Sequence, residues 1–353
     1  MGLRALSVHV VSRIGQALVR HSLSEAVDDL RADVWSSLAD EAVLERLPLE
    51  VDRDASELTA GSRPQVVLRD RGGRRYLFKL APPDQIAAEL LAYRTRRALR
   101  RLHVPAARRT MKLPELGERE GLVQPMIPHH QARLSTDPLH WTALATEHLL
   151  REHPWEWLLA NLDTHVDQYV LVGPHRLPIN IDWDHTLVDL DVEALDRFNK
   201  RSATVAPIRN LFYSEYVAGR VRGDFYGMLL EARRIEARLS DRRLSTLVNR
   251  YCDELALGRE RRRELVSRLL RRKRGLPAAF DAFVAELDHD RRVTLGVATS
   301  RKTAVEQLAA RAQDAWQRLS ITVLHDHVVR PSLKAYRAVL GVGERVIGRA
   351  ARD

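Results

Sequence analysis

The chain has very little cysteine and no long apolar run. Cys252 is the only cysteine among 353 residues, which excludes an intramolecular disulfide and argues against a thiolate metal cluster. No uninterrupted apolar stretch approaches the roughly 18 residues needed to cross a bilayer. Arg4, Arg13 and Arg20 interrupt the apolar positions near the N-terminus, which argues against a signal peptide. We therefore expect a cytoplasmic protein without a transmembrane segment.

Charge is plentiful, but it is unevenly distributed. Residues 201–353 hold 31 Lys and Arg against 18 Asp and Glu, a balance of +13, whereas residues 1–200 carry −3. This asymmetry favours an anionic partner at the basic C-terminal helices, such as nucleic acid, a membrane surface or an acidic protein. The alternative is a set of solvated, arginine-rich helix faces. Aromatic residues, 6% of the chain, are not interleaved with the arginines, which argues against a stacking platform for single strands.

Hydrophobic periodicity divides the chain into helical and strand-like parts. Residues 1–50 have the apolar spacing of two or three helices. Strand-like segments at 65–70 and 74–80 precede a helix from about 85 to 102 and a short strand at 121–127. From residue 131 on the pattern is mainly helical. Heptad-like spacing predicts helices at 225–240, 242–257, 259–273, 277–288 and 301–319.

This order of elements predicts an α+β fold in which a small β-rich lobe precedes a large helical lobe. At 353 residues and 45% hydrophobic content, the chain can bury a core large enough for two lobes. We place the boundaries at 1–55 for an N-terminal helical segment, 56–130 for the small lobe, 131–225 for the part with the hairpin described next, and 226–353 for a basic helical part.

One β-hairpin interrupts the helical region and gathers polar side chains. Apolar runs at 169–172 and 177–181 flank the turn signal of residues 173–176, Gly-Pro-His-Arg. Acidic and amide residues precede the first strand and follow the second, so the hairpin folds Asp163, Gln168 and Asp182 towards one edge. Hard oxygen ligands of this kind suit Mg²⁺ and the phosphates of a nucleotide. Phosphoryl transfer is therefore the first hypothesis.

Two motifs at this edge match a kinase pattern. Residues 163–168 read Asp-Thr-His-Val-Asp-Gln, and residues 181–185 read Ile-Asp-Trp-Asp-His. Over residues 58–190 the chain resembles the phosphatidylinositol 3/4-kinase-like group and the HipA-type bacterial kinases, which share Asp-x-His-x-x-Asn and a later metal-binding Asp. The resemblance implies a two-lobed kinase-like fold, with a small β-rich N-lobe, a large, mostly helical C-lobe and an extra helical C-terminal region.

The resemblance also implies roles for the residues of the hairpin edge. Asp163 orients or deprotonates the acceptor hydroxyl, and His165 supports the catalytic loop. Asp182 chelates Mg²⁺, and Asp184 is a second ligand or a solvated neighbour. Gln168 departs from the family, which places Asn there. It keeps the carbonyl oxygen but moves it by roughly 1.5 Å, and Mg²⁺ requires near-ideal geometry. The loop is then shifted, a metal is bound differently, or catalysis is weakened.

The upstream lobe supplies the residues that the resemblance assigns to ATP. Lys79 would bind the α- and β-phosphates, held by Glu89 from the following helix. Gly61 and Ser62 would cover the phosphates with backbone N–H groups, although the segment lacks a Gly-x-Gly-x-x-Gly pattern. Gln124 would begin the hinge whose backbone reads adenine. The expected activity is transfer of the γ-phosphate of ATP, with Mg²⁺, to a hydroxyl of a protein, lipid or small molecule.

Three alternatives remain open. A catalytically inactive kinase fold that binds nucleotide or a partner protein is favoured by Gln168 and by the basic C-terminal surface. A nucleic-acid-binding protein rests on charge alone. A metal-dependent hydrolase leaves Lys79 and Glu89 unexplained. Its ligands would be His165, Asp167, Asp182, Asp184 and His185.

Overall fold

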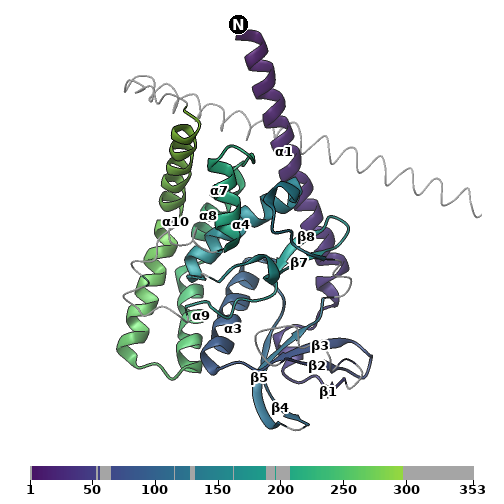
Figure 1. Cartoon of the computed structure of the whole chain (residues 1–353). Helices are drawn as coiled ribbons and strands as arrows, with labels where there is room; N and C mark the ends of the chain where they lie inside the picture. The colour runs from purple at the N-terminus through teal and green to yellow at the C-terminus, as the bar shows by residue number, and fades with distance from the viewer. Residues whose placement is uncertain are drawn as a thin grey trace, which may run out of the picture. The chain divides into compact units, whose positions relative to one another are not determined.

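The computed structural model describes residues 2–52, 55, 65–114, 116–127, 132–161, 163–187, 195 and 207–296, with side chains from residue 18 on, apart from 132, 207 and 208. The chain divides into two compact units, residues 1–297 and 298–353. Gly61, Ser62 and the predicted helix at 301–319 lie outside the described residues. Figure 1 shows the described elements in colour.

The N-terminal region is dominated by one helix. Helix α1 (Gly2–Asp33) is followed by a 3-10 turn η1 (Trp35–Ser37) and a short helix α2 (Glu41–Leu44). The prediction of two or three helices within residues 1–50 is confirmed, and most of that segment belongs to α1. The C-terminal half of α1 buries Leu23 and Leu30 in one apolar cluster with the hairpin strands.

The small lobe is an antiparallel sheet with one helix. Strand β1 (Glu50–Val51) is followed by β2 (Gln65–Arg69), β3 (Arg75–Lys79), β4 (Ala107–Leu113) and β5 (Gly117–Pro125), in the spatial order β1-β2-β3-β5-β4. The predicted β2–β3 hairpin is confirmed, with Gln65 opposite Lys79. Strand β4 was not predicted, because its Ala-Arg-Arg-Thr-Met-Lys-Leu sequence hides the apolar alternation.

Helix α3 (Pro83–Ala98) packs against this sheet and is shorter than the prediction of 85–102. It buries Ile86 and Leu90 in a cluster with Leu122 of β5. The helix ends early because Arg100 has a φ of 55° and the N–H of Arg101 returns to the carbonyl of Arg96. The chain then leads into β4.

The large lobe contains the predicted hairpin. Strand β6 (Ala132–Arg133), 3-10 turn η3 (Pro138–His140), helix α4 (Ala143–Leu159) and 3-10 turn η4 (Val166–Gln168) precede β7 (Tyr169–Val172) and β8 (Leu177–Asn180). These three strands form an antiparallel sheet in the order β6-β7-β8. The predicted hairpin is confirmed, and its register sets Tyr169 opposite Asn180.

Four helices complete the described chain: α7 (Pro207–Val217), α8 (Tyr226–Arg238), α9 (Asp241–Glu254) and α10 (Arg259–Thr294). The two helices predicted at 259–273 and 277–288 are one, because α10 continues through Pro277 while packing against α8, α9, α7 and α4. None of the described helices combines the length and apolar composition that crossing a membrane requires.

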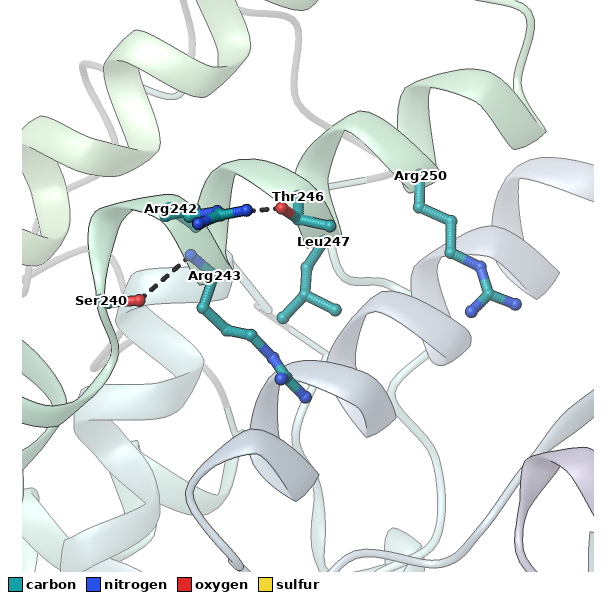
Figure 2. A pocket seen from close by; sticks show the side chains of 6 residues that line it. All are labelled: Ser240, Arg242, Arg243, Thr246, Leu247 and Arg250. Carbon is teal, nitrogen blue, oxygen red and sulfur yellow. Dashed lines mark hydrogen bonds between the residues drawn. The ribbon is translucent and has the colours of Figure 1, made fainter.

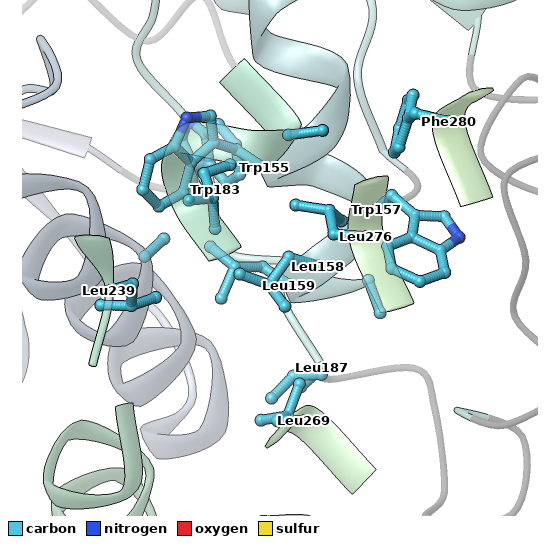
Figure 3. Close-up of a cluster of buried hydrophobic side chains, with 14 of the residues drawn as sticks. Trp155, Trp157, Leu158, Leu159, Trp183, Leu187, Leu239, Leu269, Leu276 and Phe280 are labelled. Atoms are coloured by element: carbon cyan, nitrogen blue, oxygen red, sulfur yellow. The ribbon is translucent and has the colours of Figure 1, made fainter. Parts of the chain in front are cut away.

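The core of the large lobe reaches the segment after β8. Trp183 and Leu187 from that segment are buried together with Trp155 and Trp157 of α4 and with residues of α10 such as Phe280 (Figure 3). Trp183 is fully buried, so its backbone is held by the core. The predicted α+β class, with a small β-rich part and a large helical part, is confirmed and is consistent with a two-lobed kinase-like fold.

Candidate functional site

Lys79 ends β3 and reaches the segment that follows β8. Its Nζ donates to the carbonyl of Ile181 at 3.0 Å and to Oδ1 of Asp182 at 3.3 Å. The Lys79 side chain is 11% exposed and that of Asp182 is 32% exposed, so the pair lies at the margin of the interior. The structure thus brings together a cation from the small lobe and a carboxylate from the large lobe, as the sequence analysis expected.

Glu89 is fully buried in α3 and binds the residue next to Asp182. One carboxylate oxygen accepts the backbone N–H of Trp183, and the other accepts Nε2 of Gln124 at 3.1 Å. Nε2 of His103 lies 3.4 Å from Glu89 Oε1, a contact more electrostatic than a well-formed hydrogen bond. The carboxylate therefore holds the start of the Trp183 segment.

The expected direct pair between Lys79 and Glu89 is not among the ion pairs of the described residues. The Glu89 carboxylate is engaged by Trp183 and Gln124, while Lys79 turns to Asp182. The two charges still interact. Burial alone would raise the pKa of Glu89, but His103 and the charge of Lys79 outweigh it and hold that pKa below its usual range. Burial lowers the pKa of His103, so its imidazole is neutral where it faces the ionised Glu89 carboxylate.

The side chain of Gln124 points into the interior of the protein, where it bonds Glu89. It is buried on β5, opposite Leu77 of β3, and its amide points to Glu89. The pairing of β5 with β4 ends one residue earlier, at Val123 opposite Ala107. On the side of β5 that faces β4, Gln124 is therefore the first residue beyond the strand pairing. Its proposed contact with adenine, through the backbone, stays a prediction.

Asp163 lies in a polar cluster with Gln168 and His185. Its Oδ2 accepts Nε2 of Gln168 at 3.2 Å and lies 3.3 Å from Nε2 of His185. The same His185 nitrogen is 3.7 Å from Oδ1 of the buried Asp184. The backbone N–H of Ile181 also donates to the carbonyl of Gln168 at 2.9 Å. This bond extends the β7–β8 pairing and joins the two predicted motifs.

His165 contacts the loop through its backbone, because its carbonyl accepts the N–H of Gln168 at 3.1 Å. Its Nδ1 lies 3.8 Å from Oδ2 of Asp167, and both side chains are well exposed. Asp167 is also held by Arg133, which donates to its carbonyl at 3.0 Å. In the described structure the histidine beside Asp163 is His185, which the sequence analysis had considered only for a hydrolase.

The donor groups at the edge fit Mg²⁺. Oε1 of Gln168 is buried and has no hydrogen-bond partner among the described residues, which is the expected state of an amide oxygen kept for a metal. Asp182 and Asp184 add carboxylate oxygens. The described residues contain no group of three or more His, Cys, Asp or Glu side chains arranged to hold a metal ion by themselves. The set therefore suits a metal that is completed by phosphate oxygens and water.

Three contacts of Asp182 and its neighbour Trp183 were not predicted. Oδ1 of Asn180 accepts the backbone N–H of Asp182 at 2.8 Å, an Asx turn that fixes the carboxylate's backbone. The guanidinium of Arg96 lies over the indole of Trp183, 4.5 Å from the ring centroid, and His103 meets the same ring edge-on. The Asn-x-Asp spacing could have revealed the turn, whereas the other two contacts need the fold.

Comparisons with known proteins give distant structural likenesses. No family model matches the chain, and no curated protein does. Among solved structures, six chains match. They include the Helicobacter pylori proinflammatory kinase CtkA, with a TM-score of 0.45 and 11% sequence identity, covering 69% of this chain and 99% of that one. At this level of similarity, function must be inferred from the side chains of the site.

Proposed function

We propose that this protein is an ATP- and Mg²⁺-dependent phosphotransferase of the kinase type. The observation that carries the proposal is the contact between Lys79 and Asp182, which are far apart in sequence and come from different lobes. Phosphoryl transfer needs a cation for the phosphates and a carboxylate for the metal within one small region. The contact supports such a region here.

The proposed reaction breaks the bond between the γ-phosphorus of ATP and the bridging oxygen, and forms a bond to the acceptor's hydroxyl oxygen. ADP leaves with the electron pair of the broken bond. The acceptor's proton passes to Asp163, whose exposed carboxylate is held by Gln168 and His185. Lys79 would neutralise charge on the α- and β-phosphates. The acceptor is a hydroxyl of a protein, lipid or small molecule.

Mg²⁺ would neutralise the phosphates and fix their orientation in this site. Asp182 and Gln168 would hold it, and Asp184 would contribute through its own oxygens or through water. Lys79 contacts Asp182 directly in the described structure. Binding of phosphates would therefore replace Asp182 as the partner of Lys79 by phosphate oxygens, and Mg²⁺ would then become the partner of Asp182.

The second candidate is a catalytically inactive kinase fold that binds nucleotide. Gln168 favours it, since the amide nitrogen donates to Asp163 and thereby ties up the residue that would accept the proton. The two candidates share nucleotide binding and differ only in turnover.

Two measurements test the proposal. Mg²⁺ with ATP should raise the melting temperature of the wild-type protein, and Lys79→Ala should abolish that rise. The control is Lys112→Ala, which removes an exposed lysine of β4. A Lys79→Ala protein that is stabilised as much as the wild type would contradict the proposal.

Turnover is tested by incubation with γ-labelled ATP, first for self-labelling. Asp163→Asn should lower label transfer by on the order of 10²–10³. Asp167→Asn, only four residues away, should leave it nearly unchanged, because the exposed Asp167 side chain pairs with Arg133 rather than with the Gln168 amide. Stabilisation by Mg²⁺ and ATP without any transfer would instead support the inactive fold.

A further inference from the structure

A hollow of about 470 Å³ lies on the surface along α9. Figure 2 shows Arg243 and Arg250 extending from the helix to the same side, with Leu247 between them. The residues that line the hollow include no acidic side chain. They are Ser240, Arg242, Arg243, Thr246, Leu247 and Arg250.

Two of the three guanidinium groups in this hollow are not neutralised by the described residues. Arg250 pairs with Glu41 at 2.9 Å and with Glu254 at 3.4 Å. Within the described part of the chain, neither Arg242 nor Arg243 forms an ion pair through its side chain, and both are exposed. The hollow therefore presents positive charge that is available to a ligand.

The position of these arginines costs the helix stability. They lie in the first turn of α9, where Oγ of Ser240 caps the N–H of Arg243 at 3.2 Å. The helix dipole makes this end positive, so acidic side chains are favoured there and arginines are disfavoured. An anion bound in the hollow would neutralise these arginines and interact favourably with the positive end of the helix dipole.

A second hollow, of about 600 Å³, lies where α10 begins, and it is again lined without an acidic side chain. Its residues are Asn249, Arg259, Arg262 and Arg263. Arg262 pairs with Asp253 at 2.5 Å. In the described residues Arg259 and Arg263 make no such pair, and their i, i+4 spacing puts both on one face of α10.

We propose that each of these two arginine-lined hollows binds a phosphate group of a phosphorylated protein segment. A guanidinium group binds a phosphate through two parallel hydrogen bonds, and arginine clusters are the usual readers of phosphorylated motifs. The site lies on α9 and α10, outside the Lys79–Asp182 region, so the proposal does not depend on the proposed phosphotransferase activity.

Other anionic partners fit this surface less well. Nucleic acid presents an unbroken row of phosphates, but Asp241, Asp253 and Glu254 lie among the arginines and would repel part of such a row. The lining residues include no aromatic side chain for stacking on bases. A lipid surface would be bound with exposed apolar residues, and between 240 and 263 the described chain exposes no large one.

The test is the binding of a fluorescent degenerate peptide library with one fixed phosphothreonine, compared with its unphosphorylated twin, without Mg²⁺ or nucleotide. The phosphorylated library should bind more tightly. The double variant Arg242→Glu, Arg243→Glu should weaken that binding by on the order of tenfold to a hundredfold. The variant should fold, since acidic residues are favoured at this helix end, and an unchanged melting temperature verifies this.

The matched control is the double variant Arg238→Glu, Arg292→Glu, which changes the net charge equally at exposed arginines outside both hollows. It should bind the phosphorylated library like the wild type. An equal loss in this control, equal binding of the two libraries, or a loss only in Lys79→Ala would overturn the proposal. So would tighter binding, through the same arginines, of duplex DNA or of phosphatidylserine vesicles.

Discussion

Glu89→Gln is the most informative single change at the candidate site. It keeps the size of the side chain but replaces a carboxylate with an amide. In the protein, Glu89 accepts hydrogen bonds from the Trp183 backbone and from the Gln124 amide. The new amide has one oxygen and one NH₂ group. With its oxygen on the Trp183 N–H, the NH₂ group faces Nε2 of Gln124, so the Gln124 amide must turn over to accept it, and the buried charge that accepted both bonds is gone.

The cost follows from the loss of one charge-assisted hydrogen bond in the interior. Such bonds contribute about 1.5–3 kcal/mol, and a drop of about 2 kcal/mol corresponds to roughly 3 °C in melting temperature for a unit of this size. The pKa of Glu89 is held below its usual value of 4.5. Its ionised form therefore stabilises the fold above that pH, and this contribution is lost only as the pH falls through the folded pKa. The full effect is expected at neutral pH.

The assay is urea and thermal unfolding of four proteins: the wild type, Glu89→Gln, Gln124→Glu, and the double variant that exchanges the two side chains. The exchange restores a carboxylate facing an amide, so the double variant should be more stable than either single variant, with a coupling of about 1 kcal/mol or more. Glu118→Gln, at an exposed position of β5, is the control. Additive losses in the double variant would refute the proposed contact.

Three further predictions concern the metal ligand, the sheet and acid stability. Gln168→Asn, which restores the amide length of the resembled family, should increase label transfer from ATP, and a decrease would show that the loop is built around Gln. Gly121→Ala should destabilise the protein by about 1–3 kcal/mol, because the new Cβ would lie 2.6 Å from the carbonyl of Lys79. Gly275→Ala, with open space around it in α10, should instead be neutral or stabilising in the same unfolding assay. As the pH is lowered from 6.5, the free energy of unfolding should decrease by about 1.4 kcal/mol per pH unit for each buried histidine. Burial lowers the pKa of His148 to about 3 and that of His153 far below 6.5, so only the unfolded chain takes up these protons. His153→Phe should reduce that slope, and an unchanged slope would contradict the assignment.

The hairpins were readable from the sequence because their signals are local. Apolar runs on either side of Gly72-Gly73 and Gly173-Pro174 define both strand pairs and both turns. The lengths of the helices were less readable. Pro277 is a local stop signal, and only the packing of α10 against its neighbours makes the helix continue through it.

The candidate site divides in the same way. Asp163, Gln168 and Asp182 were placed at one edge by a hairpin, a short-range element. The partner of Glu89 was missed, because His103 and Trp183 come from segments whose approach depends on the whole core. The resemblance assigned Glu89 to Lys79, and nothing in the local sequence shows that a backbone N–H takes that position.

Asp182 is connected to three separate parts of the fold, and this connection has a mechanical consequence. Lys79 ties its carboxylate to the small lobe, Asn180 ties its backbone to the hairpin, and Trp183 ties the next residue to the core of the large lobe. A ligand that draws Lys79 away from Asp182 removes only the first of these. The carboxylate then stays positioned by the other two, while the small lobe loses a contact with the large one. Binding of phosphates should therefore change how the lobes are held together more than it changes the position of Asp182 itself.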